Sequence, residues 1–180
     1  MDIVVISDVL TLPRERPEGN ADLLLSCGDV PDNVILEAAD IYGCDTIFAV
    51  KGNHDSSAPF RDPIRDAHLQ SHTFRGLDIA GFNGCWRYKP AGNYLYEQEQ
   101  VAGLMRGFPP VDIFIAHNSP EGIHECDQDV HRGFRAFRTY IREEKPALFF
   151  HGHQHVREET RLGGMRVIGV YGVQMFEDVI

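Results

Sequence analysis

A short apolar strand followed at once by a polar turn recurs along this chain, and this pattern limits the possible folds most. The clearest example is the β-branched and aromatic run of residues 46–50, typical of a buried strand, which leads into Gly52-Asn53-His54-Asp55. A glycine, an amide, an imidazole and a carboxylate thus stand where the strand should end. In open α/β sheets, ligands bind beyond the carboxyl ends of the strands. The pattern therefore predicts an α/β fold with a functional site along one sheet edge.

The rest of the chain supplies the other strands and the helices of such a fold. Apolar runs predict strands at residues 3–6, 23–25, 112–116 and 147–150, a hairpin of 73–75 with 77–82, and antiparallel strands at 166–170 and 173–176. Helical spacing predicts helices at 34–42 (with Asn33 as N-cap), 97–106 and 133–145, and one short helix within 59–67. Residues 83–96 and 118–131 are expected to form long loops. Because no repeat or long linker divides the chain, residues 1–180 are expected to form a single domain.

The composition argues against several classes of protein. A formal net charge of -10 argues against sequence-independent binding to duplex nucleic acid, which needs a basic surface. No apolar run reaches transmembrane length, and residues 1–6 enter a strand without the basic region of a signal peptide. Four cysteines are scattered without a C-x-x-C pair, namely Cys27, Cys44, Cys85 and Cys126. This favours reduced thiols, and we expect a cytoplasmic protein with no membrane association.

The side chains at the strand ends form a ligand set for divalent transition metals. They are Asp8, Asp29 with Asp32, Asn53 with His54, His117, and His153 with His155. Imidazole, carboxylate and amide oxygen without thiolate suit such ions. Two neighbouring ions need a bridging carboxylate, and Asp29, which follows a central strand, is the natural bridge. Such a pair of ions activates a water molecule and clamps a phosphoryl group for in-line attack.

Four sequence blocks, in order and each after a strand, resemble those of the calcineurin-like metallophosphoesterases. They are Gly28-Asp29-Val30-Pro31-Asp32, Gly52-Asn53-His54-Asp55, His117 and Gly152-His153-Gln154-His155. The resemblance covers nearly the whole chain and implies an α/β fold of the four-layer α/β/β/α sandwich type. It also implies a metal-dependent hydrolase of small phosphate esters, either phosphodiesters or phosphomonoesters, with phosphodiesters favoured.

The resemblance also implies two divalent metal ions and the residues that bind them. The first ion would be bound by Asp8, Asp29 and His155, and the second by Asp29, Asn53, His117 and His153. Mn²⁺ is the expected ion, while Fe and Zn²⁺ suit the same donors. The family offers a further histidine at the position of Leu10, and leucine has no lone pair to donate. We therefore expect a weakened first site and an intact second site.

Two residues receive catalytic roles from the same resemblance. His54 is expected to protonate, or hydrogen-bond to, the leaving-group oxygen, and Asp32 is expected to orient it and favour its charged form. The nucleophile implied by the family is a metal-bound hydroxide rather than a side chain. Retention of His54 and Asp32 favours an enzyme over the alternative, a catalytically weak or inactive scaffold or binding protein built on the same fold.

Several other residues remain open at this stage. Asp55 is either an outer support for the ligands or only a turn residue. Arg87 and Tyr88 either meet a phosphate or its leaving group, or are ordinary loop residues. His151 is expected to be a buried, hydrogen-bonded histidine. His68, His72, His124 and His131 are expected at the surface or in loops, with substrate contact as an alternative for His124 and His131.

Overall fold

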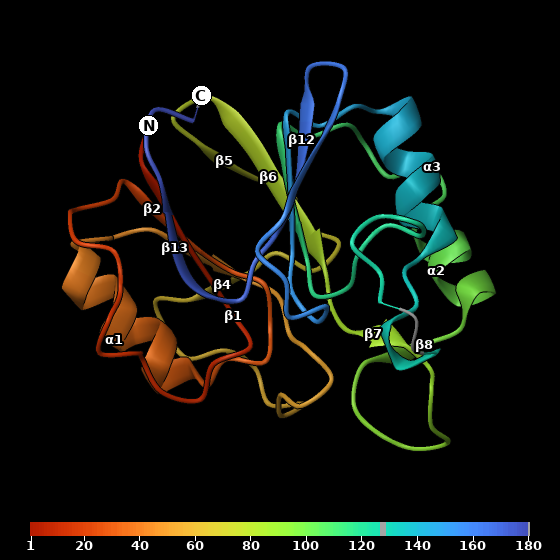
Figure 1. Cartoon of the computed structure of the whole chain (residues 1–180), viewed down its shortest axis with the longest axis horizontal. Helices are drawn as coiled ribbons and strands as arrows, with labels where there is room; N and C mark the ends of the chain where they lie inside the picture. The colour runs from red at the N-terminus through yellow and green to blue at the C-terminus, as the bar shows by residue number, and fades with distance from the viewer. Residues whose placement is uncertain (127–128, 180) are drawn as a thin grey trace.

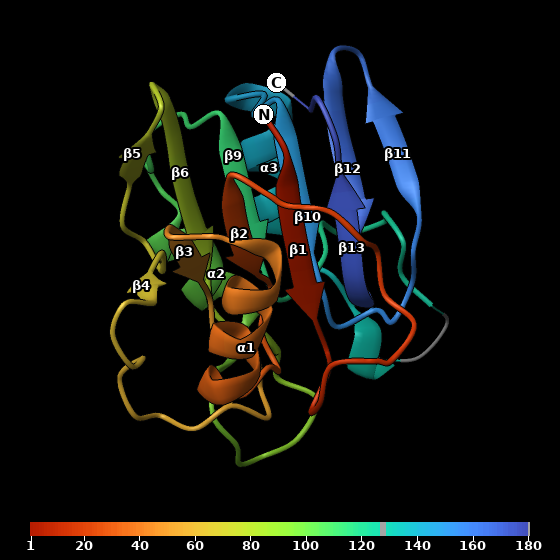
Figure 2. The same ribbon diagram turned by 90° about the vertical axis from the view of Figure 1, so that its left-hand side faces the viewer.

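Two β-sheets lie face to face at the centre of the molecule, and helices cover their outer faces (Figure 1). The computed structural model describes residues 1–126 and 129–179. Helix α1 (Asp32–Tyr42) covers one sheet, while α2 (Gln98–Leu104) and α3 (Arg135–Glu143) cover the other (Figures 1 and 2). This is the four-layer α/β/β/α sandwich expected from the sequence.

The first sheet has the strand order β13-β1-β2-β3-β4. Its strands are β1 (Ile3–Ser7), β2 (Leu23–Ser26), β3 (Ile47–Ala49), β4 (Arg65–Asp66) and β13 (Gly172–Phe176). Strands β1 to β4 are parallel, and only β13 runs antiparallel to its neighbour β1. The parallel strands β1, β2 and β3 therefore all end at the same edge of this sheet.

The second sheet has the strand order β11-β12-β10-β9-β6-β5. Its strands are β5 (His72–Phe74), β6 (Leu77–Phe82), β9 (Ile113–Ala116), β10 (Leu148–His151), β11 (Glu159–Leu162) and β12 (Met165–Gly169). The central strands β6, β9, β10 and β12 are parallel. A separate short pair, β7 (Cys85–Trp86) with β8 (Leu95–Tyr96), lies in the loop before α2, and a 3₁₀ turn spans Asp129–His131.

The apolar alternation along β1 explains the layering. Ile3 and Val5 are fully buried between the two sheets, whereas Val4 and Ile6 are fully buried under α1. A third apolar cluster lies between the second sheet and the helices α2 and α3, where Phe137 packs against Phe149. Burying each such side chain stabilises the fold by roughly 1.5–3 kcal/mol, so both faces of each sheet must stay covered.

The helices begin and end where local sequence dictates, with one difference from the prediction. Helix α1 starts directly after Pro31 and includes Asn33, which was predicted to cap it. Pro31 is itself the N-cap, with φ -59° and ψ 143°, and it provides no side-chain hydrogen bond to the first turn. Gly43 ends the helix in the left-handed conformation with φ 67°. Helix α2 begins with a capping box between Glu97 and Gln100.

Two other sequence predictions were wrong in detail. Residues 59–67 contain strand β4 and no helix, because residues 65–66 add to the edge of β3. The tail strands β12 and β13 do not pair with each other: β12 pairs antiparallel with β11, and β13 crosses to the other sheet. Hydrophobic alternation alone does not tell which partner a strand takes. Among the described residues, no helix has both the length and the apolar character needed to cross a membrane.

Candidate metal centre

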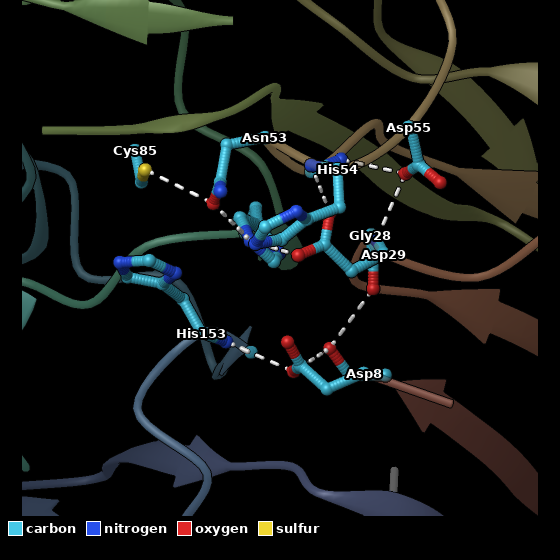
Figure 3. A network of polar contacts seen from close by, with 12 residues as sticks. Asp8, Gly28, Asp29, Asn53, His54, Asp55, Cys85 and His153 are labelled. Carbon is cyan, nitrogen blue, oxygen red and sulfur yellow. Dashed lines mark hydrogen bonds and ion pairs between the residues drawn. The ribbon is translucent and has the colours of Figure 1, made fainter. Parts of the chain in front are cut away.

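The residues predicted to bind metal converge where the two sheets meet at the carboxyl ends of their parallel strands. Asp8 follows β1, Asp29 lies beyond β2, and His117 follows β9 of the opposite sheet. One ligand atom from each of these three residues lies within 4.8 Å of the other two. Figure 3 shows Asp8, Asp29, Asn53 and His153 arranged around a common centre. Segments from both sheets therefore supply donors to one small volume.

Four of the predicted ligands lie at backbone positions with positive φ. The angles are 56° at Asp8, 54° at Asp29, 65° at His153 and 53° at His155. This conformation costs a non-glycine residue on the order of 1 kcal/mol. The chain thus turns sharply as it leaves each strand, and the surrounding hydrogen bonds hold these strained turns in place.

Asp8 presents one carboxylate oxygen to the centre. Its Oδ2 accepts hydrogen bonds from Ser7 Oγ at 2.6 Å and from the backbone N–H of His153 at 2.9 Å. Its Oδ1 is buried and accepts no hydrogen bond from the described residues, while His155 Nε2 lies 3.4 Å away. Burial raises the pKa of Asp8, but the interactions with His155, His117 and Ser7 lower it more, so the net shift is downward. Asp8 is therefore an ionised carboxylate with an open acceptor position.

Asp29 lies at the middle of the group. Its Oδ1 accepts the backbone N–H of His54 at 2.8 Å, and its Oδ2 lies 3.3 Å from His117 Nε2. Burial raises the pKa of Asp29, but the attraction of His117 and the two hydrogen bonds lower it to about 2. A carboxylate held ionised between two loops is suited to bridge two cations.

The two buried histidines are held in defined orientations by backbone carbonyls. His117 Nδ1 lies 2.9 Å from Cys27 O, and His153 Nε2 lies 2.9 Å from Val130 O. A ring N–H donated to each carbonyl leaves the lone pair on His117 Nε2 and on His153 Nδ1. The two ring centroids are 5.0 Å apart. Both imidazoles are therefore prepared to donate a nitrogen to the same region.

The pKa values of these histidines differ because their neighbours differ. Burial lowers the pKa of His117, but Asp29 raises it to about 9, whereas burial lowers the pKa of His153 to about 3. A proton on His117 Nε2 and a cation would compete for the same position beside Asp29. His155 is exposed, and its interaction with Asp8 raises its pKa.

Asn53 is fixed by contacts that the sequence did not predict. Its Oδ1 accepts a hydrogen bond from Cys85 Sγ at 3.1 Å and lies 3.2 Å from His117 Nε2. Its Nδ2 donates to Tyr88 Oη at 3.4 Å. The buried Cys85 thiol was missed because a scattered cysteine in a glycine-rich loop carries no sequence signal of its position. Tyr88 thus reaches the site, whereas Arg87 is held by Glu97 and by the carbonyl of Leu95.

Asp55 supports the ligands from outside. Its side chain is buried, and its Oδ2 accepts the backbone N–H groups of Asp29 at 2.8 Å and of Gly52 at 2.7 Å (Figure 3). Of the two roles left open by the sequence, the structure therefore shows the outer support.

Two glycines permit the close approach of these loops. A Cβ atom at Gly52 would collide with the Asp29 carboxylate, and one at Gly152 would collide with the Ser7 hydroxyl and the Asp8 carboxylate. The carboxylates of Asp29 and Asp8 thus occupy the space that a side chain at position 52 or 152 would need.

The contacts of Asp32 differ from the prediction. Its Oδ1 lies 3.4 Å from Lys51 Nζ, and its Oδ2 accepts the backbone N–H of Arg61 at 2.9 Å. Lys51 is buried and needs a counter-ion, which explains why the Asp32 carboxylate pairs with it rather than with His54. The His54 ring is exposed at the edge of the centre, and its side chain makes no hydrogen bond to the described residues.

Leu10, the histidines outside the centre and the cysteines contribute no ligand to the group formed by Asp8, Asp29 and His117. Leu10 is 77% exposed and contributes nothing to the centre. His151 is fully buried and bonded to His124 at 2.9 Å, which confirms its predicted structural role and shows that His124 belongs to the same pair. His68 accepts the backbone N–H of Asn83, and His72 stacks on Phe48, so both are packed rather than freely exposed. All four cysteines are free thiols, as expected.

The donor set fits divalent cations. Asp8 Oδ1 is a buried acceptor without a hydrogen bond from the part of the chain that the structure describes, and the two histidines direct lone pairs into a region that also holds Asp29 and Asn53. Oxygen and nitrogen donors of this kind suit Mn²⁺, Fe or Zn²⁺.

Comparison with known proteins agrees with this geometry. A sequence model of calcineurin-like phosphoesterases matches residues 2–157. No curated protein matches the sequence significantly. Similar solved structures include TT1561 of Thermus thermophilus, with 15% identity, 93% of this chain and 88% of that chain covered, and a TM-score of 0.59. Phosphopantetheinyl hydrolase from Mycobacterium tuberculosis has 13% identity, with 94% of this chain and 89% of that chain covered and a TM-score of 0.60.

A third similar structure is Vps29 from Entamoeba histolytica complexed with Zn²⁺, with 13% identity, 96% of this chain and 74% of that chain covered, and a TM-score of 0.50. At these identities the solved structures show a shared fold and no more. The family model, however, covers most of the sequence, including every block that carries a predicted ligand. The chain belongs to the calcineurin-like phosphoesterase family.

Proposed function

We propose that this protein is a metal-dependent phosphoesterase that hydrolyses a small phosphate ester. The convergence of Asp8, Asp29 and His117, with ligand atoms within 4.8 Å of one another, is the observation that carries the proposal. A fold of this kind has no structural need for two ionised carboxylates in one buried volume, because they repel each other and a cation between them would offset that repulsion.

The contacts support the donor sets that the family resemblance implies. We assign the first cation to Asp8, Asp29 and His155, and the second to Asp29, Asn53, His117 and His153. Asp29 is shared because it lies next to both groups. When bound, the two cations supply Lewis acidity toward the phosphoryl oxygens and lower the pKa of water at the site. Mn²⁺ is the ion we propose, with Fe and Zn²⁺ as alternatives.

The chain's own residues orient the reacting groups. The carbonyls of Cys27 and Val130 hold the rings of His117 and His153 in fixed orientations. His54 lies at the exposed rim, and its backbone N–H ties it to Asp29. We propose that its imidazole donates a proton or a hydrogen bond to the leaving-group oxygen. Asp32 has no part in this step, since its carboxylate is engaged by Lys51 and Arg61.

A phosphodiester is the favoured substrate class. Asp8 and Asp29 place two ionised carboxylates at the centre. A diester carries one negative charge, whereas a monoester near neutral pH carries about 1.5–2, by analogy with phosphorylated side chains. The monoanion of a diester is therefore repelled less by these two carboxylates.

Hydrolysis of two model esters tests the proposal. Purified protein loaded with Mn²⁺ should hydrolyse bis-p-nitrophenyl phosphate faster than p-nitrophenyl phosphate, and His117→Ala should abolish both turnover and tight Mn²⁺ binding. Tight Mn²⁺ binding with no turnover of either ester would contradict the enzyme and support the second candidate, an inactive scaffold on the same fold. Leu10, which is exposed and offers no donor to a metal, favours the scaffold. The retained His54 favours the enzyme.

A further inference from the structure

The end of the long loop before α3 is held by side chains that are, or directly follow, proposed metal ligands. Gln154 Nε2 donates to the carbonyl of His131 at 2.7 Å, and Asn118 Nδ2 donates to the carbonyl of Arg132 at 2.8 Å. Together with the bond from the His153 ring to Val130 O, these contacts hold three consecutive carbonyls. Asn118 and Gln154 each directly follow a proposed ligand, so the position of His131 is tied to the ligands themselves.

The His131 ring lies among the proposed ligands. Its centroid is 5.3 Å from that of His153 and 6.0 Å from that of His155. An imidazole binds a metal at about 2.0–2.1 Å, which puts the centres of two rings on one ion on the order of 5–6 Å apart. The spacing between His131 and His155 therefore suits a shared cation.

One nitrogen of this ring is already engaged. His131 Nδ1 lies 2.6 Å from Cys126 Sγ, and Nε2 makes no hydrogen bond to the described residues. An N–H donated from Nδ1 to the sulfur leaves the lone pair on Nε2. His117 and His153 resemble it in that one nitrogen of each ring lies on a backbone carbonyl outside the centre.

We propose that His131 supplies the first metal ion with the imidazole that position 10 lacks. The complete first set is then Asp8, Asp29, His155 and His131, with Cys126 as the positioning residue for the His131 ring. The inference rests on the proposed metal centre. It explains how the first ion could be bound although Leu10 offers no donor. The donor comes from the loop over the second sheet instead of from the turn after β1.

Mn²⁺ binding, measured by isothermal titration calorimetry and by Mn²⁺ electron paramagnetic resonance, tests this directly. Wild-type protein should bind two ions. His131→Ala should weaken one of them by at least about 10–100-fold, roughly the loss that even an outer partner of a ligand causes, and leave the other unchanged. Adding Leu10→His to His131→Ala should restore the affinity for the weakened ion. If His131 only contacted the substrate, this second substitution would restore nothing.

Three controls separate the possible failures. Arg132→Ala alters the next, exposed side chain of the same loop and should keep both ions at wild-type affinity. Cys126→Ser should weaken the first ion by about tenfold. Unchanged affinity in His131→Ala, while His117→Ala loses an ion, would overturn the role of His131 and leave the proposed function standing. Absence of Mn²⁺ binding to the wild-type protein would instead overturn both.

Discussion

The Asp55 carboxylate accepts the backbone N–H of Asp29 at 2.8 Å and so joins two loops 26 positions apart in the sequence. The same oxygen accepts the N–H of Gly52 at 2.7 Å. Asp55→Ala leaves two buried donors without an acceptor, at about 1–3 kcal/mol each. We expect the free energy of unfolding, measured with urea in EDTA, to fall by roughly 2–6 kcal/mol. Asp55→Asn keeps an acceptor oxygen and should lose much less; equal losses would contradict this account.

Gly152 is required for space rather than for conformational freedom. A methyl group there would collide with Ser7 and Asp8, so Gly152→Ala should displace a carboxylate and lower the free energy of unfolding by about 1–3 kcal/mol. Gly164→Ala is the matched control, because a Cβ at Gly164 meets nothing within 4 Å. Calorimetric Mn²⁺ titration should show weaker binding in Gly152→Ala only. Equal stability and equal Mn²⁺ affinity of the two variants would show that the loop at Gly152 can move to accommodate a methyl group.

His54 tests the chemistry separately from metal binding. The ring is exposed, and its side chain makes no hydrogen bond to the described residues, so His54→Ala should fold and bind Mn²⁺ as the wild type does. Loss of a general acid typically costs roughly 10²–10⁴-fold, and we expect a fall in kcat of about that size. The loss should shrink for esters with good leaving groups, which need no proton. A uniform loss for all leaving groups would argue against the proposed role.

Asp32 and Lys51 form a largely buried ion pair whose nitrogen and oxygen are 3.4 Å apart. Asp32→Asn leaves the Lys51 ammonium without its partner, which can cost about 3–5 kcal/mol for a fully buried pair and less here. We therefore expect lower stability with kcat near the wild-type value. The double variant Asp32→Leu with Lys51→Met should recover part of the loss. A shifted pH–rate profile in stable Asp32→Asn protein would instead restore Asp32 to the catalytic group.

Leu10→His in the wild-type background should tighten the first cation, since an added imidazole follows Asp8 at the family's spacing. If His131 already supplies a donor, the gain should be smaller here than in the His131→Ala background. Comparing the four Mn²⁺ titrations of this cycle gives the coupling between positions 10 and 131. Equal gains in both backgrounds would show that the two side chains act independently.

Much of this molecule could be predicted from its sequence because its signals are local. The buried strands β1, β2, β9 and β10 are apolar runs, and the polar residues after them follow from the way parallel strands end at one edge. The four-layer arrangement followed from the family resemblance, and alternation of Val4 with Val5 shows its physical basis.

The missed features depend on contacts between distant segments. Cys85 reaches Asn53 across 32 positions, and Asp32 pairs with Lys51 rather than His54 because the path of the loop after β3 brings a buried ammonium beside it. Strand β11 and the separate partners of β12 and β13 depend on which edge of a sheet is open. Local patterns carry none of this information.

The positive φ angles at Asp8, Asp29, His153 and His155 set how the centre would respond to an arriving ion. Because folding of the two sheets already forces these turns, the entropy of ordering the backbone at these four residues is lost on folding rather than on ion binding. Capture of a cation would then need no rearrangement of these turns, but it would have to displace the proton that Asp29 favours on His117.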